Sequence, residues 1–168
     1  TRVTVLPHEA LGPDVRGEYI DGELVVSPSP TYSHQRSIHR LANIAEEACG
    51  AGVEVAEGWA WMLGDDELVP DLMVVERHGE EVRFTGIPLL VVEVLSSDRA
   101  ADLVRKLGKY AAAGLERYWV IDPAGPGIVL FTAREGLLVE AGRFRGDDEA
   151  TLDFGAATVA FRPADLLP

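Results

Sequence analysis

One apolar run limits the folds open to this chain more than any other feature. Residues 89–95 read Leu-Leu-Val-Val-Glu-Val-Leu, so a strand made from them is apolar on both faces apart from Glu93. Such a run is typical of an interior strand covered on both sides. An ionised carboxylate inside it is costly unless a cation or a charge partner compensates it. Because Asp71 follows Pro70 22 positions earlier, we expect two such acids and therefore a metal ion.

The surrounding pattern predicts a mixed α/β or α+β fold, with a central mixed sheet flanked by helices. Asp21-Gly22 between two short apolar stretches predicts a hairpin turn. The expected order is a hairpin at 18–27, a helix from Thr31 or Ser33 to about Cys49, strands at about 53–63 and 67–76 joined by a polar turn at 64–67, a strand at about 88–95, a helix at about 99–113 capped by Ser96, Ser97 or Asp98, a strand at 118–121 and a peripheral hairpin from Gly127 to Glu140.

Composition limits the possible functions of the chain but does not identify one. The 168 residues, 47% of them apolar, are enough for one core and predict a single domain over residues 1–168. The single Cys49 excludes an internal disulfide framework and, with no secretory leader or membrane-length apolar run in the sequence, predicts a cytoplasmic protein without membrane contact. A net charge of −13 opposes nucleic-acid binding unless basic side chains gather on one face or a divalent ion attracts the substrate. The alternative is that the acidity only keeps the protein soluble.

Helical periodicity separates buried from exposed polar residues on both predicted helices. On the first helix His34 heads an apolar stripe continued by Ile38, Leu41, Ala45 and Ala48. On the second helix a stripe through Leu103, Leu107, Tyr110, Ala111 and Gly114 has Lys106 at its edge. Lys106 can therefore reach back toward the sheet, whereas Lys109 is predicted to be solvated.

The order of these motifs resembles a known group of nucleases. An Asp followed by Glu-x-Lys on adjacent strands is the pattern of the PD-(D/E)xK nuclease superfamily, but here Leu95 occupies the position of the lysine. Lys106 on the following helix offers a replacement, as in the Uma-type putative restriction endonuclease family. The chain resembles that family at Tyr19 through Val25, Ser27-Pro28 before His34-Gln35, Val69-Pro70-Asp71, Val91 through Ser96, Asp102 through Lys106 to Tyr110-Ala111, Gly114, and Tyr118 through Pro123.

The resemblance implies a restriction-endonuclease-like core with extra N-terminal and C-terminal hairpins, and a metal-dependent endonuclease acting on DNA. Asp71 and Glu93, with the backbone carbonyl of Val94, would bind Mg²⁺ or Mn²⁺, an ion that prefers oxygen ligands. Lys106 would orient the attacking water or neutralise charge on the transition state. Glu23 would serve as a third acid, and His34 and Tyr110 as supporting residues. Relatives with this core often pair, so a homodimer is an expectation too.

Each residue also has a simpler interpretation. Glu93 could form a buried ion pair with a Lys or Arg, and Lys106 could be a helix lysine that follows an apolar edge to water. Glu23 could be an ordinary hairpin residue, and His34 a core histidine. A whole-protein alternative follows from the charge and from Leu95: a non-catalytic module that binds nucleic acid or protein and retains the nuclease fold.

Overall fold

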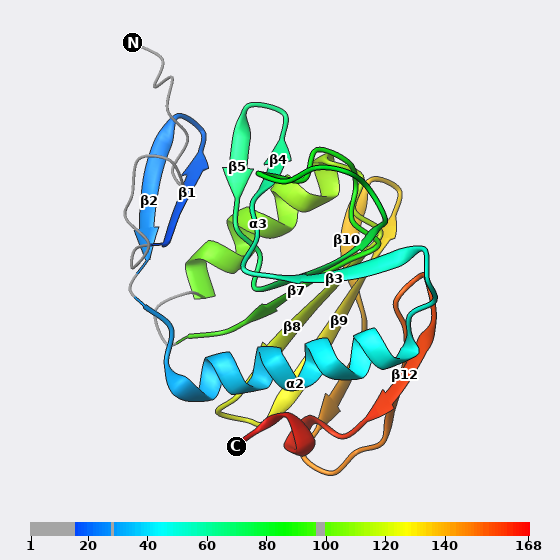
Figure 1. Cartoon of the computed structure of the whole chain (residues 1–168). Helices are drawn as coiled ribbons and strands as arrows, with labels where there is room; N and C mark the ends of the chain where they lie inside the picture. The colour runs from blue at the N-terminus through cyan, green and yellow to red at the C-terminus, as the bar shows by residue number, and fades with distance from the viewer. Residues whose placement is uncertain (1–15, 28, 97–99) are drawn as a thin grey trace.

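A central sheet organises the computed structural model, which describes residues 16–27, 29–96 and 100–168 (Figure 1). Its six strands run in the order β10-β9-β8-β7-β6-β3. All neighbours are antiparallel except β7 and β8, which are parallel. The predicted mixed sheet is therefore confirmed. The strands are β3 (Val53–Glu57), β6 (Leu72–Glu76), β7 (Leu90–Val94), β8 (Arg117–Asp122), β9 (Gly127–Arg134) and β10 (Leu137–Arg145).

Within the described residues one helix lies on each face of this mostly antiparallel sheet, and the fold is α+β. Helix α2 (Tyr32–Ala48) begins where the Thr31 side chain accepts a hydrogen bond from the His34 N–H at 3.3 Å, as the sequence predicted. Its apolar stripe packs on Val92 and Val94 of β7. Helix α3 (Ala100–Ala112) packs on the opposite face, against Val91. The predicted caps Ser97 and Asp98 lie outside the described residues.

A smaller sheet in the order β2-β1-β5-β4 lies over the α3 side of the molecule (Figure 1). Its hairpin of β1 (Arg16–Ile20) and β2 (Glu23–Ser27) turns at Asp21 and Gly22, with φ values of 53° and 84°. Two positive φ angles are what a two-residue hairpin turn requires, so the predicted hairpin is confirmed. The second hairpin of this sheet joins β4 (Trp61–Leu63) to β5 (Asp66–Leu68).

The two long strands predicted between residues 53 and 76 are wrong in one respect, because each is divided between the two sheets. Gly58 has a φ of +56°, which turns the chain out of β3, and Pro70 interrupts the return between β5 and β6. The polar turn is also more buried than its composition suggests. Glu67 is inaccessible to solvent and pairs with Arg83 at 3.0 Å.

The C-terminal region is more regular than the sequence indicated. The predicted peripheral hairpin is an integral part of the sheet, because β9 pairs with β8 over the length of that strand and β10 extends to Arg145. The tail forms a hairpin of β11 (Ala150–Asp153) and β12 (Thr158–Phe161), then a short 3-10 helix η1 (Pro163–Leu166). Its apolar side chains complete the cluster beneath α2. Among the described residues, none of the helices has the length and apolar character needed to cross a bilayer.

Candidate functional site

Asp71 and Glu93 lie opposite one another at the end of the β6–β7 ladder. The antiparallel register pairs Leu72 with Val92, and one further step brings Asp71 opposite Glu93. Residues in such positions have Cβ atoms about 4.5–5.5 Å apart on the same face of the sheet. Both side chains are buried. The two acids are therefore neighbours on adjacent strands, but their carboxylates contact different partners: that of Asp71 lies against the Val94 N–H and His34, and that of Glu93 against Lys106 and Tyr110.

Pro70 explains why the Asp71 side chain turns back onto the ladder. The same register would pair Val94 with position 70, where proline has no N–H to donate. The Val94 N–H instead donates to Asp71 Oδ2 at 2.8 Å. Because the N–H and C=O of a strand residue point to the same neighbour, the Val94 carbonyl faces the same side and meets no donor from position 70.

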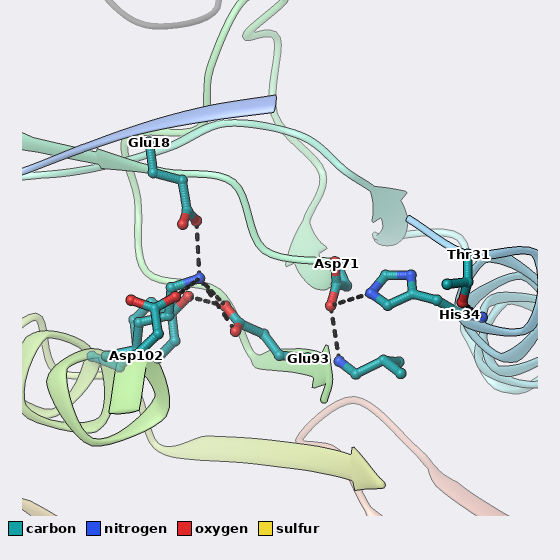
Figure 2. A network of polar contacts seen from close by, with 9 residues as sticks. Glu18, Thr31, His34, Asp71, Glu93 and Asp102 are labelled. Atoms are coloured by element: carbon teal, nitrogen blue, oxygen red, sulfur yellow. Dashed lines mark hydrogen bonds and ion pairs between the residues drawn. The ribbon is translucent and has the colours of Figure 1, made fainter. Parts of the chain in front are cut away.

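His34 holds the other side of Asp71. Its Nε2 atom lies 3.2 Å from Asp71 Oδ2, and both side chains are buried (Figure 2). The capped first turn of α2 positions this ring, because His34 N–H donates to Thr31. Within the described residues His34 Nδ1 is buried without a hydrogen-bond partner. The predicted core-facing position of His34 is correct, and in it the ring contacts an acid of the candidate site.

Lys106 is the cation at the centre of the site. Its side chain is 1% exposed, and its Nζ atom lies 3.0 Å from Glu93 Oε1 and 3.0 Å from Glu18 Oε1. Asp102, one turn earlier on α3, lies 3.8 Å away. Tyr110 donates from its hydroxyl to Glu93 Oε1 at 2.6 Å. The helix thus brings both Lys106 and Tyr110 to the carboxylate of Glu93, and Leu95 shares the apolar cluster on this face.

Burial and charge act against each other in this group. Burial raises the pKa of Glu93 above its ordinary value, and the nearby carboxylates of Asp71 and Glu18 add to the rise, while Lys106 opposes it. Burial by itself lowers the pKa of Lys106, but the carboxylates of Glu93, Glu18 and Asp102 outweigh it and the pKa is raised. Burial raises the pKa of Tyr110 well above its ordinary value. Burial and the neighbouring charges therefore favour the protonated form of both Lys106 and Glu93.

Glu18 is the residue that sequence reasoning missed. It lies on β1, is buried, and accepts a hydrogen bond from the Val69 N–H at 2.9 Å through the same oxygen that contacts Lys106. Its other oxygen, Oε2, has no hydrogen-bond partner in the described part of the chain. Period-two alternation puts Glu18 on the same face as Ile20, a fully buried residue, and this signal could have identified it.

Glu23 and Lys109 differ from their predicted positions. Glu23 is exposed at the start of β2, where its charge acts on Arg105, so Glu18 takes the place in the site expected for Glu23. The reason is that β1, and not the outer strand β2, lies beside β5 and faces α3. Lys109 is not free in solvent: its side chain is 28% exposed, contacts Asp21, and lies 2.8 Å from Asp66.

The donor set fits a hard divalent cation, although the present side-chain arrangement is not a closed cage. Within residues 16–27, 29–96 and 100–168, no three His, Cys, Asp or Glu side chains converge as metal ligands. Mg²⁺, however, needs only one or two carboxylates with waters and a carbonyl. Asp71, Glu93 and the Val94 carbonyl offer oxygen donors of this kind, and Glu18, whose Oε1 contacts Lys106, has a buried Oε2 without a hydrogen-bond partner in the described part of the chain.

Comparisons with known proteins place the chain in a family and identify a solved structure with the same fold. The model of a family described as Uma2, putative restriction endonuclease, matches residues 4–160. Among solved structures, the chain is similar to one described as a putative nuclease belonging to DUF820 from Anabaena variabilis ATCC 29413. The match has a TM-score of 0.76 at 20% identity and covers 89% of this chain and 88% of that one, which shows a shared fold. No curated protein matches the chain.

Proposed function

Because this chain belongs to the Uma2 family of putative restriction endonucleases, we propose that it is a divalent-metal-dependent endonuclease that hydrolyses phosphodiester bonds in DNA. The family and the fold support a nuclease. The metal, the substrate and the roles of individual residues are our proposal, and they rest on the chemistry of the buried polar group.

One observation carries the proposal. Glu18 and Glu93 both lie against the buried ammonium of Lys106, and Glu18 Oε2 has no hydrogen-bond partner among the described residues. Buried negative charge in excess of its partners is unfavourable, and a hard cation offsets it. A purely structural ion pair would need one carboxylate for one ammonium, so the second carboxylate at Lys106 favours a site that binds a cation.

Each residue has a role consistent with its contacts. Asp71, Glu93 and the Val94 carbonyl would hold Mg²⁺ or Mn²⁺, and the ion would supply Lewis acidity at the scissile phosphate and make water easier to deprotonate. Lys106, protonated throughout the physiological range, would orient the attacking water and stabilise negative charge on the phosphate oxygens. His34 would fix the rotamer of Asp71, and Tyr110 that of Glu93.

The test is cleavage of plasmid DNA by the purified protein with Mg²⁺ or Mn²⁺. We expect Asp71→Asn and Lys106→Gln to lower the rate by about 10²–10³-fold, the range found when one group that stabilises transition-state charge is removed. Lys109→Gln is the matched control, since it removes a lysine of the same helix that contacts neither Asp71 nor Glu93, and it should keep full activity. Cleavage that survives Asp71→Asn and Lys106→Gln would overturn the proposal.

A second candidate function is a module that keeps the fold without turnover. It is favoured by Glu93, whose two oxygens both lie within 3.3 Å of Lys106 Nζ and whose Oε1 also accepts from Tyr110. A carboxylate occupied in this way could serve stability alone. DNA binding without cleavage under both metals would support this alternative. If the protein cleaves, sedimentation with and without DNA tests whether it acts as the expected homodimer.

A further inference from the structure

The outer edge of β3 is a region of the described chain, away from the candidate site, where a sheet ends beside a groove. β3 is an edge strand of the six-stranded sheet, and Figure 1 shows it above the C-terminal half of α2. Edge strands present backbone donors and acceptors that can pair with another chain. Proteins commonly protect such edges with a covering loop or with inward-pointing charge. β3 is only five residues long, but its side chains are partly accessible over four of them.

The hydrogen bonds at both ends of β3 show which backbone groups face outward. Arg77 N–H donates to Gly52 O at 2.9 Å, and Gly58 N–H donates to Asp71 O at 3.0 Å. Bonded pairs alternate along an antiparallel ladder, so the even-numbered residues of β3 face β6 and the odd-numbered ones face away. The outward groups of Val55 and Glu57 have no hydrogen-bond partner in the described part of the chain.

A groove of about 720 Å³ follows this edge. One wall is the C-terminal end of α2, with Glu46 and Cys49, and the other carries Trp59 and the segment 78–81. The floor is β3 itself. Val53 and Val55 lean toward the α2 wall, where they pack on the apolar cluster, whereas Glu54 lies on the opposite face beside Val75. A strand added at this edge would therefore meet a largely apolar wall that also carries Glu46 on one face and a polar wall on the other.

The charge of the groove selects the occupant. Four acids line it, Glu46, Glu54, Glu80 and Glu81, with His78 beside them. Arg77 lies 3.3 Å and His78 3.9 Å from Glu54, whereas within the described residues no cationic side chain is paired with Glu46, Glu80 or Glu81. Nucleic acid is disfavoured here because its phosphates would meet these carboxylates. A second copy pairing through its own β3 is disfavoured as well, because it would bring the acidic walls of two identical grooves together.

We propose that the edge of β3 is a docking site for an extended basic segment of a partner protein, which adds to the sheet as a strand. Backbone pairing with Val55 and Glu57 would supply affinity, and the walls would select alternating apolar and Lys or Arg side chains. The apolar side chains would lie toward Val53, Val55 and Cys49, and the basic ones toward Glu54, Glu80 and Glu81. This interaction is independent of the proposed nuclease activity.

The first test uses the full chain and a labelled, end-blocked octapeptide that alternates Lys and Val. Fluorescence anisotropy should show binding at least about tenfold tighter than for a Glu–Val peptide of the same length. Two further peptides carry N-methyl groups on the odd-numbered or on the even-numbered residues. One of the two should bind about tenfold more weakly or worse, because its methyl groups replace the N–H groups that pair with β3. Equal binding of the Lys–Val and Glu–Val peptides, or indifference to N-methylation in both methylated peptides, would overturn the proposal.

The second test reverses charge at exposed groove residues that make no side-chain contact the fold depends on. The double variant Glu46→Lys, Glu81→Lys should bind the Lys–Val peptide about tenfold more weakly than wild type. The control Glu47→Lys, Asp147→Lys makes an equal charge change outside the groove and should bind the peptide as tightly as wild type. In NMR spectra of the wild-type chain, addition of the peptide should change the chemical shifts of the Val55 and Glu57 backbone amides. Self-association through β3, or equal effects of the two double variants, would contradict the proposal.

Discussion

Two lysines one turn apart on α3 make similar contacts in very different surroundings. Lys106 reaches Glu18 on β1 and Glu93 on β7, both at 3.0 Å. Lys109 reaches Asp21, in the turn after β1, and Asp66 on β5. The two clusters differ in burial: the Lys106 side chain is 1% exposed and that of Lys109 is 28% exposed.

The comparison teaches that burial, and not the pairing of charges, marks the candidate site. In the outer cluster water can solvate whatever remains when one partner is removed, so the contacts contribute little. In the inner cluster a remaining charge would stay buried and unpaired. The same property makes the inner carboxylates suitable for a metal ion, since their negative charge cannot be screened by solvent.

The largest expected effect separates the two lysines by stability. Lys106→Met should lower the free energy of unfolding by about 3–5 kcal/mol, because it leaves the carboxylates of Glu18 and Glu93 buried without their ammonium. Lys109→Met should change it by much less. Urea unfolding followed by circular dichroism measures both. Equal losses for the two variants would contradict the comparison, as would a Lys106→Met protein as stable as wild type without added metal.

The next effect sharpens the comparison by testing the acid on β1. We expect Glu18→Gln to reduce metal-dependent cleavage by about 10–100-fold, the usual cost of losing a group that orients metal ligands. Glu23→Gln, an equivalent change on the exposed strand β2, should leave the rate unchanged. Plasmid cleavage at saturating Mn²⁺ measures both rates. If the two variants behave alike, Glu18 has only a structural role.

A third prediction concerns pH. Burial raises the pKa of Glu93 above its ordinary 4.5, so the folded protein binds this proton more tightly than the unfolded chain does. The stabilisation that results is complete below pH 4.5 and is lost as the pH rises through the folded-state pKa. Glu93→Gln cannot ionise and should lack this loss. Without metal, the stability of the variant relative to wild type should therefore increase as pH rises above 4.5, and added Mg²⁺ should stabilise wild type alone. A pH-independent difference would contradict this prediction.

The smallest effect is expected from salt. At 1 M salt the Debye length is about 3 Å, so the stability difference between wild type and Lys109→Met should nearly disappear. The difference between wild type and Lys106→Met should persist, because solvent ions do not reach that cluster. Thermal unfolding at low and high NaCl measures both differences. Equal sensitivity to salt would mean that the inner cluster is as open to solvent as the outer one.

Much of the site could be predicted because it depends on local pattern. The apolar run around Glu93 predicted an interior strand, and helical periodicity predicted that Lys106 and His34 lie on the sheet side of their helices. Alternation puts Glu18 on the same face as Ile20, but that this face is covered follows from the contact of β1 with β5, which is far away in sequence, so Glu18 was missed. The divided strands between residues 53 and 76 were missed for a similar reason, since their residues belong to two sheets whose pairing no local pattern specifies.

The acid-lined edge of β3 could not have been predicted from sequence alone. Its outward backbone groups are defined only by which residues bond to β6, and its walls come from α2 and from the segment 78–81. The burial of the tail could have been predicted in part, because Leu152, Val159 and Phe161 alternate with exposed residues along their strands.

The most direct test of the central claim is calorimetric titration of the metal-free protein with Mn²⁺. We predict one ion per chain, with binding abolished or weakened by about 10–100-fold or more in Asp71→Asn and in Glu93→Gln and retained in Glu23→Gln. Because Asn and Gln have nearly the same size as the acids they replace, folding of each variant can be verified by circular dichroism. Absence of binding by wild type, or unchanged binding by both site variants, would show that the buried carboxylates serve the fold and hold no metal.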